Sequence, residues 1–433
     1  MYYLQYTRKD LYIMIQKPKG TLDILPSETP LWHKIEATVR DVTACYGFLE
    51  IKFPTFEQSN LFKRGVGGTT DIVQKEMFTL DDRDGNELCL RPEGTACVVR
   101  SIVENGLFNE PMPLRLYYLT NFFRYEKPQA GRSREFYQFG TEMFGTEKAS
   151  ADATVISVAD TVLKRLGVNA RLNLNSIGCK NCRPRYHAAL VEYFSAHRDE
   201  LCDTCKERLK TNPLRILDCK SPICGALCEN APKTVDSLCD DCRTHFDELG
   251  KNLDAMSIEY TVNPRIVRGL DYYTRTVFEF ISDDIGAQST VCGGGRYDGL
   301  VKELDGPDLC GIGFGLGITR LVLAMKKNAE KRGEALPEAE KPLVYIAPMG
   351  ERAALFAQKT VFALREKGIF ADCDITGRSL KAQMKYADKI GALYCAVLGD
   401  NELDAGECEL KNLRNGEKKT VKTETLADSS VYE

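Results

Sequence analysis

The chain has 433 residues, of which 43% are hydrophobic and 28% charged, and its formal net charge is −4. This length predicts two or three domains, and the composition excludes an intrinsically disordered chain. No apolar run reaches the roughly 18–20 residues needed to span a membrane, and residues 1–10 lack the apolar core of a signal peptide. We therefore expect a cytoplasmic protein without a membrane segment. The net charge neither indicates nor excludes contact with nucleic acid.

The first 170 residues predict an antiparallel sheet with helices. The pattern predicts a helix over residues 31–46 and strands over 48–53, 87–91, 114–123 and 134–144. Pro54 closes the first strand, because proline cannot donate to a strand ladder. The polar, turn-rich stretch 126–134 joins the last two strands. Two long strands joined in this way indicate an antiparallel sheet and not a doubly wound parallel one.

A cysteine-rich segment interrupts this pattern and looks like an insertion, after which sheet-like sequence resumes over residues 259–317. A helix over 319–327 follows, and the charged stretch 326–341 is expected to be a linker. In the last 90 or so residues, short apolar strands alternate with helical patterns, and the strands are predicted at 343–348, 369–372 and 393–398. This alternation is typical of a small α/β domain with a largely parallel sheet.

Two peptides are more informative than the rest of the chain: RGLDYYTRTVFE at 268–279 and GGGRYDGL at 293–300. They crowd tyrosines, arginines, carboxylates and a glycine run between β-rich apolar stretches. Each buried charge or hydroxyl needs a partner, so a protein core has no use for this mixture. The peptides indicate a pocket that binds a small polar ligand.

The sequence contains no GxxxxGK[ST] phosphate loop and no strand–GxGxxG–helix unit. A nucleotide would therefore have to be held by arginines, whose guanidinium groups match phosphate oxygens in pairs. The candidates are Arg124, Arg132, Arg134 and Arg320. A surface salt bridge is the better interpretation of any one of them, and only their joint pattern favours a nucleotide site.

Three motifs follow one another in the order found in class II aminoacyl-tRNA synthetases. The helix over 31–46 with its strand and Pro54 resembles motif 1, which builds the dimer interface in that class. The strand–loop–strand of residues 123–142 resembles motif 2. GIGFGLGITR at 311–320 resembles motif 3, where glycines at every second position clear one strand face for a flat purine. Within the class, LRPEGTA at 90–96 and the two peptides above resemble histidyl-tRNA synthetases specifically.

The resemblance implies a homodimer that ligates L-histidine to its tRNA through histidyl-adenylate, using ATP with Mg²⁺ and releasing AMP and pyrophosphate. It implies that histidine is bound by Glu93, Thr95, Gln138, Glu142, Tyr272, Tyr273 and Tyr297. Glu93, Thr95 and Gln138 would hold the α-amino group, since a carboxylate and an amide accept hydrogen bonds from an ammonium. Glu142 and Tyr273 would meet the imidazole nitrogens, with the other two tyrosines lining the pocket.

The resemblance further implies that ATP is bound by Arg124, Arg132, Phe136 and Arg320. Arg124 would bind the α-phosphate and Phe136 would stack on adenine, while the other two arginines would reach the outer phosphates. Arg268 would contact the histidine carboxylate and the α-phosphate, and would stabilise transition-state charge where related enzymes use a metal. The implied catalytic residues are thus Arg268, Arg124 and Gln138.

Three features depart from the family pattern. Thr319 stands where an acidic residue is common, Arg275 stands where glycine is usual, and residues 1–13 precede a natural beginning at Met14. Two other interpretations use the same fold. One is the regulatory subunit that partners ATP phosphoribosyltransferase, which lacks the C-terminal domain and usually degrades the tyrosine and motif 2 peptides. The other is an RNA-binding homologue, which would not need Arg268, Glu93 and Gln138 together.

Nine of the seventeen cysteines lie between residues 179 and 242, and such clustering favours metal or plain thiols in a reducing compartment. Three CxxC pairs predict structural zinc on Cys179, Cys182, Cys202, Cys205, Cys239 and Cys242. The pairing stays open, because Cys219, Cys224 and Cys228 lie between the pairs and three histidines (His187, His197, His245) lie nearby. The alternative is a thiol-rich insertion without metal.

We expect an α+β fold, in which a class II antiparallel-sheet catalytic domain carries a cysteine-rich, helical insertion. A C-terminal α/β domain that resembles an anticodon-binding domain follows it. On a helix of that domain, Arg378, Lys381, Lys385 and Lys389 form one basic stripe, either a solvated face or a contact for tRNA. The expected divisions are an extension (1–13), the catalytic domain (14–175 and 247–330), the insertion (176–246), a linker (331–341) and the anticodon-binding domain (342–433).

Overall fold

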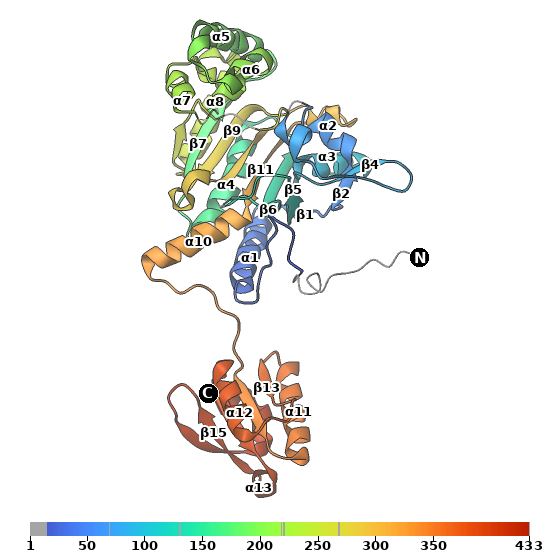
Figure 1. Cartoon of the computed structure of the whole chain (residues 1–433), viewed down its shortest axis with the longest axis vertical. Coiled ribbons are helices and arrows are strands. Elements are labelled where there is room, and N and C mark those ends of the chain that lie inside the picture. Colours follow the sequence, from blue (N-terminus) through green and yellow to red (C-terminus); the bar gives the residue numbers. More distant parts are fainter. Residues whose placement is uncertain are drawn as a thin grey trace, which may run out of the picture. The chain divides into compact units, whose positions relative to one another are not determined.

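The computed structural model describes residues 15–68, 70–129, 131–217, 219, 221–266 and 269–432, without the side chains of 286–288. The chain divides into two compact units between Pro337 and Glu338 (Figure 1). The expected extension over 1–13 lies outside the described residues. Within the described ranges, no helix combines the length and the apolar character needed to cross a membrane.

The first unit is built on a mainly antiparallel sheet that has eight strands in the described part of the chain, in the order β1-β5-β6-β11-β10-β9-β7-β8. Only the pairs β1–β5 and β7–β8 are parallel among these neighbours. The strands are β1 (Leu49–Glu50), β5 (Leu114–Phe123), β6 (Glu135–Phe144), β7 (Arg171–Ser176), β8 (Tyr260–Val262), β9 (Thr274–Ile281), β10 (Thr290–Arg296) and β11 (Gly311–Gly317). The predicted antiparallel sheet is confirmed.

Amphipathic helices cover this sheet. In α1 (Thr29–Cys45) the buried side chains of Leu31, Ile35, Val39 and Val42 recur every three or four residues, which gives the helix one apolar face. That face joins α4 (Ala149–Arg165), α10 (Ile318–Arg332) and the sheet in one core. A smaller core lies under α2 (Ser59–Gly65), α3 (Thr95–Glu104) and α9 (Leu300–Glu303), beside a small sheet of β2 (Phe56–Gln58), β3 (Thr79–Asp81) and β4 (Glu87–Leu90).

Two predicted elements differ in length. The strand expected over 48–53 is a ladder only at Leu49–Glu50, because the backbone leaves the edge of the sheet before Pro54. The charged stretch expected to start a linker at Lys326 is helical as far as Arg332, since Ala329 and its neighbours bury an apolar face. That helix ends at Gly333, whose φ of 66° suits glycine.

The cysteine-rich insertion is helical. It consists of α5 (Arg183–Ala196), α6 (Asp203–Thr211), α7 (Pro222–Glu229) and the first half of α8 (Asp240–Ala255), with short 3₁₀ turns between them. Figure 1 shows α5, α6 and α7 gathered beyond the β7 side of the sheet, and α8 running back toward it. Helix α8 packs on α4, so the insertion is anchored to the sheet domain.

The second unit is a small α/β domain. Its sheet has the order β13-β12-β14-β15-β16, with strands β12 (Val344–Pro348), β13 (Ala371–Cys373), β14 (Tyr394–Leu398), β15 (Glu407–Asn412) and β16 (Lys418–Lys422). The predicted parallel strands are β13, β12 and β14. The antiparallel hairpin β15–β16 was not predicted, because its charged alternation lacks the apolar runs of the other three. The helices are α11 (Glu351–Glu366), α12 (Leu380–Lys389) and α13 (Asp400–Ala405).

A fully buried ion pair joins α4, α8 and β10. Arg296 is 0% exposed, and its Nε lies 3.0 Å from the Oδ1 of Asp152, which is also 0% exposed. His245 of α8 lies 2.8 Å from the other carboxylate oxygen. Burial by itself would raise the pKa of Asp152, but Arg296 and His245 hold it below its ordinary value. The ion pair therefore fixes Arg296, the arginine of the GGGRYDGL peptide, against α4 and α8.

We predict that Asp152→Ala lowers the free energy of unfolding by about 3–5 kcal/mol, because it removes the fully buried counter-charge of Arg296 and leaves only Asp298, 3.2 Å from the guanidinium. Denaturant titration measures the loss. The matched control is Asp160→Ala on the same helix, which removes a pair with the exposed Lys164 and should cost less than about 1 kcal/mol. Equal losses in the two variants would contradict a special role for the buried pair.

Candidate functional site

A cavity of about 520 Å³ lies on the sheet where β6, β11, β10 and β9 run side by side. The sequence motifs quoted above contain most of its lining residues. The predicted residues that line it are Glu93, Thr95, Arg124, Arg132, Phe136, Gln138, Tyr272, Tyr273 and Arg320. Glu142 and Tyr297 lie behind the wall, at 0% and 1% exposure. Arg268 lies outside the described residues.

One end of the cavity is built around Glu93, at the start of α3. Its carboxylate accepts hydrogen bonds from the backbone amides of Thr95 (2.9 Å) and Ala96 (2.7 Å) and from the hydroxyl of Tyr272 (3.2 Å). Burial raises the pKa of Glu93, and these hydrogen bonds oppose that shift. The result is a positioned carboxylate at the cavity wall, able to accept further hydrogen bonds from a cationic ligand.

Glu142 forms a second, deeper carboxylate centre. Its two oxygens accept hydrogen bonds from the hydroxyls of Thr95 (2.7 Å) and Tyr297 (2.5 Å). Burial raises its pKa to about 8, because the hydroxyl hydrogen bonds only partly replace lost hydration. Space for this carboxylate exists only because residue 313 is glycine, since a Cβ there would lie 1.8 Å from Oε2. Gly313 therefore makes room for Glu142, while Gly315 and Gly317 line the cavity itself.

Tyr118 is a site residue that the sequence analysis missed. It lines the cavity from β5, and Cβ atoms at Gly94 or Gly140 would lie only 2.3 Å and 2.2 Å from its ring. Gly94 and Gly140 both lie in motifs quoted above. Two glycines on facing segments could have indicated that a large side chain fills the space between them. The ring fills that space and brings its hydroxyl to Glu142.

The guanidinium groups of Arg132 and Arg320 lie at the other end of the cavity, and Arg124 lies between them and Glu93, since its Nε donates to the carbonyl of Pro92 (2.8 Å). Glu126 lies 3.3 Å from Arg132 and 3.9 Å from Arg124, so one carboxylate serves two arginines; the sequence analysis did not single it out. Burial, followed by repulsion from Arg132, lowers the pKa of Arg320. Such an excess of positive charge favours a polyanion. The side chain of Arg124 also lies over the ring of Phe136, 5.3 Å from its centroid.

Two of the departures noted in the sequence have a structural context. Thr319 lines the cavity beside Arg320. Arg275 has a φ of 48°, a left-handed conformation that suits glycine. Its amide donates to Gly178 (2.9 Å) and its carbonyl accepts from Ile177 (2.8 Å), so paired backbone groups hold the strained residue at the edge of the insertion.

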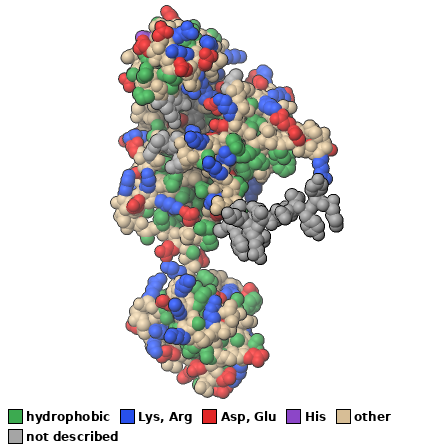
Figure 2. Space-filling view, viewed as in Figure 1, with side chains coloured by type: hydrophobic (Ala, Val, Ile, Leu, Met, Phe, Trp, Pro, Cys, Tyr) green, Lys and Arg blue, Asp and Glu red, His purple; other side chains and the backbone are tan. Residues whose placement is uncertain are grey.

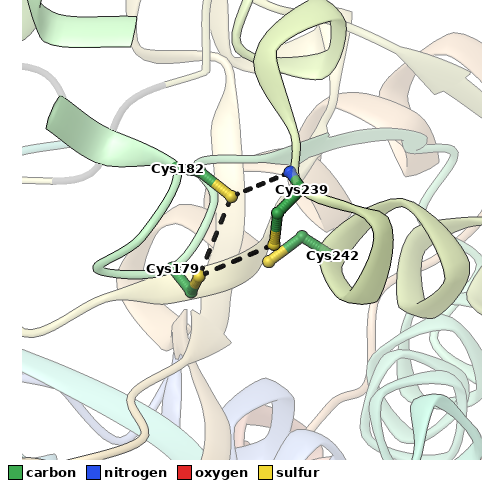
Figure 3. Close-up of side chains that lie close together, drawn as sticks. All are labelled: Cys179, Cys182, Cys239 and Cys242. Atoms are coloured by element: carbon green, nitrogen blue, oxygen red, sulfur yellow. Dashed lines mark hydrogen bonds between the residues drawn. The ribbon is translucent and has the colours of Figure 1, made fainter. Parts of the chain in front are cut away.

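The insertion brings eight cysteines together as two groups of four. Cluster 1 is Cys179, Cys182, Cys239 and Cys242 (Figure 3), and cluster 2 is Cys202, Cys205, Cys219 and Cys224. The six predicted ligands thus divide between two groups, and Cys219 and Cys224, which were left open, complete the second. Neither group contains Cys228 or a histidine, and His245 instead contacts Asp152.

Comparisons with known proteins agree with this architecture. The family model for histidyl-tRNA synthetase matches residues 20–181 and 227–321, and the model for the anticodon binding domain matches 343–429. The histidine–tRNA ligase of Caldanaerobacter subterraneus subsp. tengcongensis is 51% identical over 96% of this chain and 98% of its own. That of Acetivibrio thermocellus is 50% identical over 96% and 99%. The crystal structure of apo S. aureus histidyl-tRNA synthetase superimposes with a TM-score of 0.80 at 37% identity, covering 96% and 99%.

The buried carboxyl of Glu142 should make stability depend on pH. Its pKa in the folded protein is about 8, against an ordinary value of 4.5, so folding retains a proton that the unfolded chain releases. The resulting stabilisation is complete below pH 4.5 and is lost as the pH rises through 8. Over this window the ligand-free protein should lose up to about 1.4 kcal/mol of unfolding free energy per pH unit from this group.

Glu142→Gln cannot release the proton and should lose less stability over the same range. Urea denaturation of both proteins at pH 5.5 and pH 8 gives the comparison, in which other titrating groups cancel. Parallel pH profiles for the two proteins would show that Glu142 does not hold the proton.

Proposed function

The chain belongs to the histidyl-tRNA synthetase family, and we propose that it ligates L-histidine to its tRNA in two steps through histidyl-adenylate. The observation that carries this proposal is one cavity with two unlike ends. Carboxyl and tyrosine side chains gather around Glu93, Arg132 and Arg320 lie around Glu126, and Arg124 lies between the two groups. An amino acid fits the first group and a triphosphate the second, so their reacting groups would meet near Arg124.

The residues around Glu93 and Glu142 include candidate partners for the α-ammonium group and the imidazole of histidine. Glu93, with Thr95 and Gln138, supports binding of the α-ammonium group, because Glu93 is a fixed acceptor at the cavity wall. Glu142 and Tyr273 are our candidates for the imidazole nitrogens, with Tyr272 and Tyr297 around them. A carboxyl with a pKa near 8 can either donate or accept a hydrogen bond near neutral pH, which suits a ring with one donor and one acceptor.

The ATP end uses charge and shape. Arg124 would bind the α-phosphate, while Arg132 and Arg320 would bind the outer phosphates, because Arg124 lies between Glu93 and the other two guanidinium groups. Phe136 would stack on the adenine, which lies flat because Gly315 and Gly317 present no side chains to the cavity. Mg²⁺ would neutralise phosphate charge, and Glu126 and Glu279 supply carboxylate oxygens of the kind it prefers in the lining.

In the first step, a carboxylate oxygen of histidine attacks the α-phosphorus of ATP and pyrophosphate leaves, forming histidyl-adenylate. Arg268 would contact the carboxylate and the α-phosphate and would stabilise the transition-state charge, with Arg124 and Gln138 positioning the reactants. In the second step, a terminal ribose hydroxyl of the tRNA attacks the activated carbonyl and AMP leaves. A zinc ion in the insertion would be structural and would take no part in either step.

The second unit would bind the tRNA. On the face shown in Figure 2, Lys and Arg side chains are interspersed with Asp and Glu, so phosphate contacts must be local. Helix α12 offers such a place, because Lys381, Lys385 and Lys389 are exposed on one face. Arg378 is less available, since it binds Asp374 at 2.8 Å and lies over Tyr386.

We also propose that the enzyme is a homodimer in the cytoplasm, where it would charge tRNA for protein synthesis. The dimer is supported by the position of β1 at the edge of the large sheet, next to α1. Leu49 of β1 and Phe56 of β2 expose large apolar side chains, 66% and 56% accessible. A second copy of the chain would cover this surface.

Histidine-dependent exchange between ATP and pyrophosphate tests the first step directly. The purified protein should catalyse exchange with histidine and not with the other amino acids, because Glu142 and Tyr273 are proposed to hydrogen-bond the imidazole nitrogens. Arg268→Ala should still bind histidine and should lose at least about 100-fold in exchange rate. Exchange within a few-fold of the wild type in that variant would show that Arg268 has another role. Histidine binding without exchange in the wild type would favour a regulatory homologue.

Replacing Lys381, Lys385 and Lys389 together by Gln should raise the Kd for tRNA about tenfold and reduce its dependence on salt, because phosphate contacts release counterions. The rate of ATP–pyrophosphate exchange should stay unchanged. A matched control replaces Lys418, Lys419 and Lys422 of β16 by Gln. This control removes the same amount of positive charge from the same domain. If both triple variants lose tRNA affinity equally, α12 is not the contact surface.

A further inference from the structure

The two cysteine clusters have the geometry of mononuclear metal sites. Within each cluster the ligand atoms all lie within 4.8 Å of one another. The sulfur atoms of Cys179 and Cys182 are 3.7 Å apart, and those of Cys179 and Cys239 are 3.9 Å apart. Tetrahedral Zn²⁺ with Zn–S bonds of about 2.3 Å requires sulfur separations of about 3.8 Å. In cluster 2, Cys202 and Cys219 are also 3.9 Å apart. Figure 3 shows the four sulfurs of cluster 1 facing one another.

The surrounding backbone favours thiolates in these positions. The amide of Cys239 donates to the sulfur of Cys182 (3.1 Å), and the amide of Cys202 donates to the sulfur of Cys224 (3.3 Å). Three of these four cysteines are N-cap residues: Cys182 of α5, Cys202 of α6 and Cys239 of α8. Amide donors and helix N-termini both stabilise negative charge, and a site of four thiolates and one Zn²⁺ carries a net charge of −2.

Apart from the packing of α8 on α4, the insertion is held by a small apolar core of its own. That core includes Cys205, Cys224 and Cys228 beside large side chains such as Phe194 and Ile216. A core of this size supplies limited stability, and small natural domains commonly add disulfides or a metal. None of the eight clustered cysteines forms a disulfide. A bound metal ion is the cross-link that their grouping would allow.

One arginine near each cysteine cluster donates a hydrogen bond to the peptide that forms one wall of the cavity. Arg183, next to Cys182 of cluster 1, donates a hydrogen bond to the carbonyl of Tyr273. Arg215 lies in the turn that leads to Cys219 of cluster 2, and it donates to the carbonyl of Gly269 (2.8 Å). Gly269 and Tyr273 both line the cavity. Two arginines placed by two clusters thus hold the two ends of the Gly269–Tyr273 peptide.

Cluster 1 has a second connection to the site. Cys242 and His245 lie on the same turn of α8, and His245 contacts Asp152, which binds Arg296. Arg296 is followed by Tyr297, whose hydroxyl binds Glu142. This series of contacts joins cluster 1 through α8 to the residues behind the cavity wall.

We infer that each cysteine cluster binds one structural zinc ion, and that the two ions hold Arg183 and Arg215 in place to support the Gly269–Tyr273 wall of the cavity. The second half of this inference rests on the proposed function, since it assigns that wall to the histidine pocket. Arg183 and Arg215 are positioning residues, because they contact the wall and not the substrate. The metal content of the insertion does not depend on the proposed function.

Metal analysis of the full chain, purified with reductant and without chelator, tests the ions. We expect two zinc ions per chain, about one in Cys239→Ser or Cys219→Ser, and two in the control Cys228→Ser, whose cysteine belongs to neither cluster. Co²⁺ exchanged into the wild type should give thiolate charge-transfer and tetrahedral d–d bands that saturate at two equivalents. Chains that contain no metal, or iron in place of zinc, would overturn the assignment.

Histidine binding by calorimetry tests the coupling. Arg183→Gln and Arg215→Gln should keep two zinc ions, yet raise the Kd for histidine about tenfold, because each loses a charged hydrogen bond to the wall. In exchange assays their KM for histidine should rise more than kcat falls. Arg198→Gln, on the exposed turn after α5, is the control and should bind like the wild type.

Removing zinc with a chelator should weaken histidine binding to a similar extent, and adding zinc back should restore it. Arginine variants that bind histidine like the wild type would show that the clusters stabilise the insertion only. Absence of histidine binding in the wild type, with two zinc ions present, would overturn the proposed function and leave the metal sites standing.

Discussion

The structure depends on burying carboxylates beneath a sheet without leaving any of them unpartnered. An uncompensated buried charge costs more than most single packing interactions contribute. Asp152 is matched by Arg296 and His245, and Glu142 by hydroxyls. These groups lie on elements far apart in the sequence, so satisfying them fixes how α4, α8, β6 and β10 are arranged.

The same strands that bury the carboxylates also shape the space above them. Glycines at every second position of β11 have separate tasks, since Gly313 admits the carboxylate of Glu142 and Gly315 leaves the cavity floor flat. Hydrogen-bond acceptors gather around Glu93, guanidinium groups gather around Glu126, and Arg124 lies between the two groups. Under the proposed function, this arrangement would orient an amino acid and a nucleotide head to head, so that positioning and fixed charge would supply most of the catalysis.

The cysteine-rich insertion belongs to the same design, because it is the outer support of one cavity wall. The peptide Gly269–Tyr273 has little regular structure and receives hydrogen bonds from Arg183 and Arg215. A loop wall held by a small helical module can be precise only if the module is rigid. The zinc ions proposed for the two cysteine clusters would supply that rigidity to a segment with a small core.

By itself, the sequence determined the fold class, the main strands and the motifs that contain most of the cavity lining, because apolar alternation and short motifs are local signals. It could not give the grouping of the cysteines, since contacts between Cys179 and Cys239 depend on how the chain returns through α8. Nor could it show that Tyr118 fills the space above Gly94 and Gly140, or that Glu126 serves two arginines. Only the tertiary structure decided these features, because each joins side chains from separate segments whose distance no local pattern encodes.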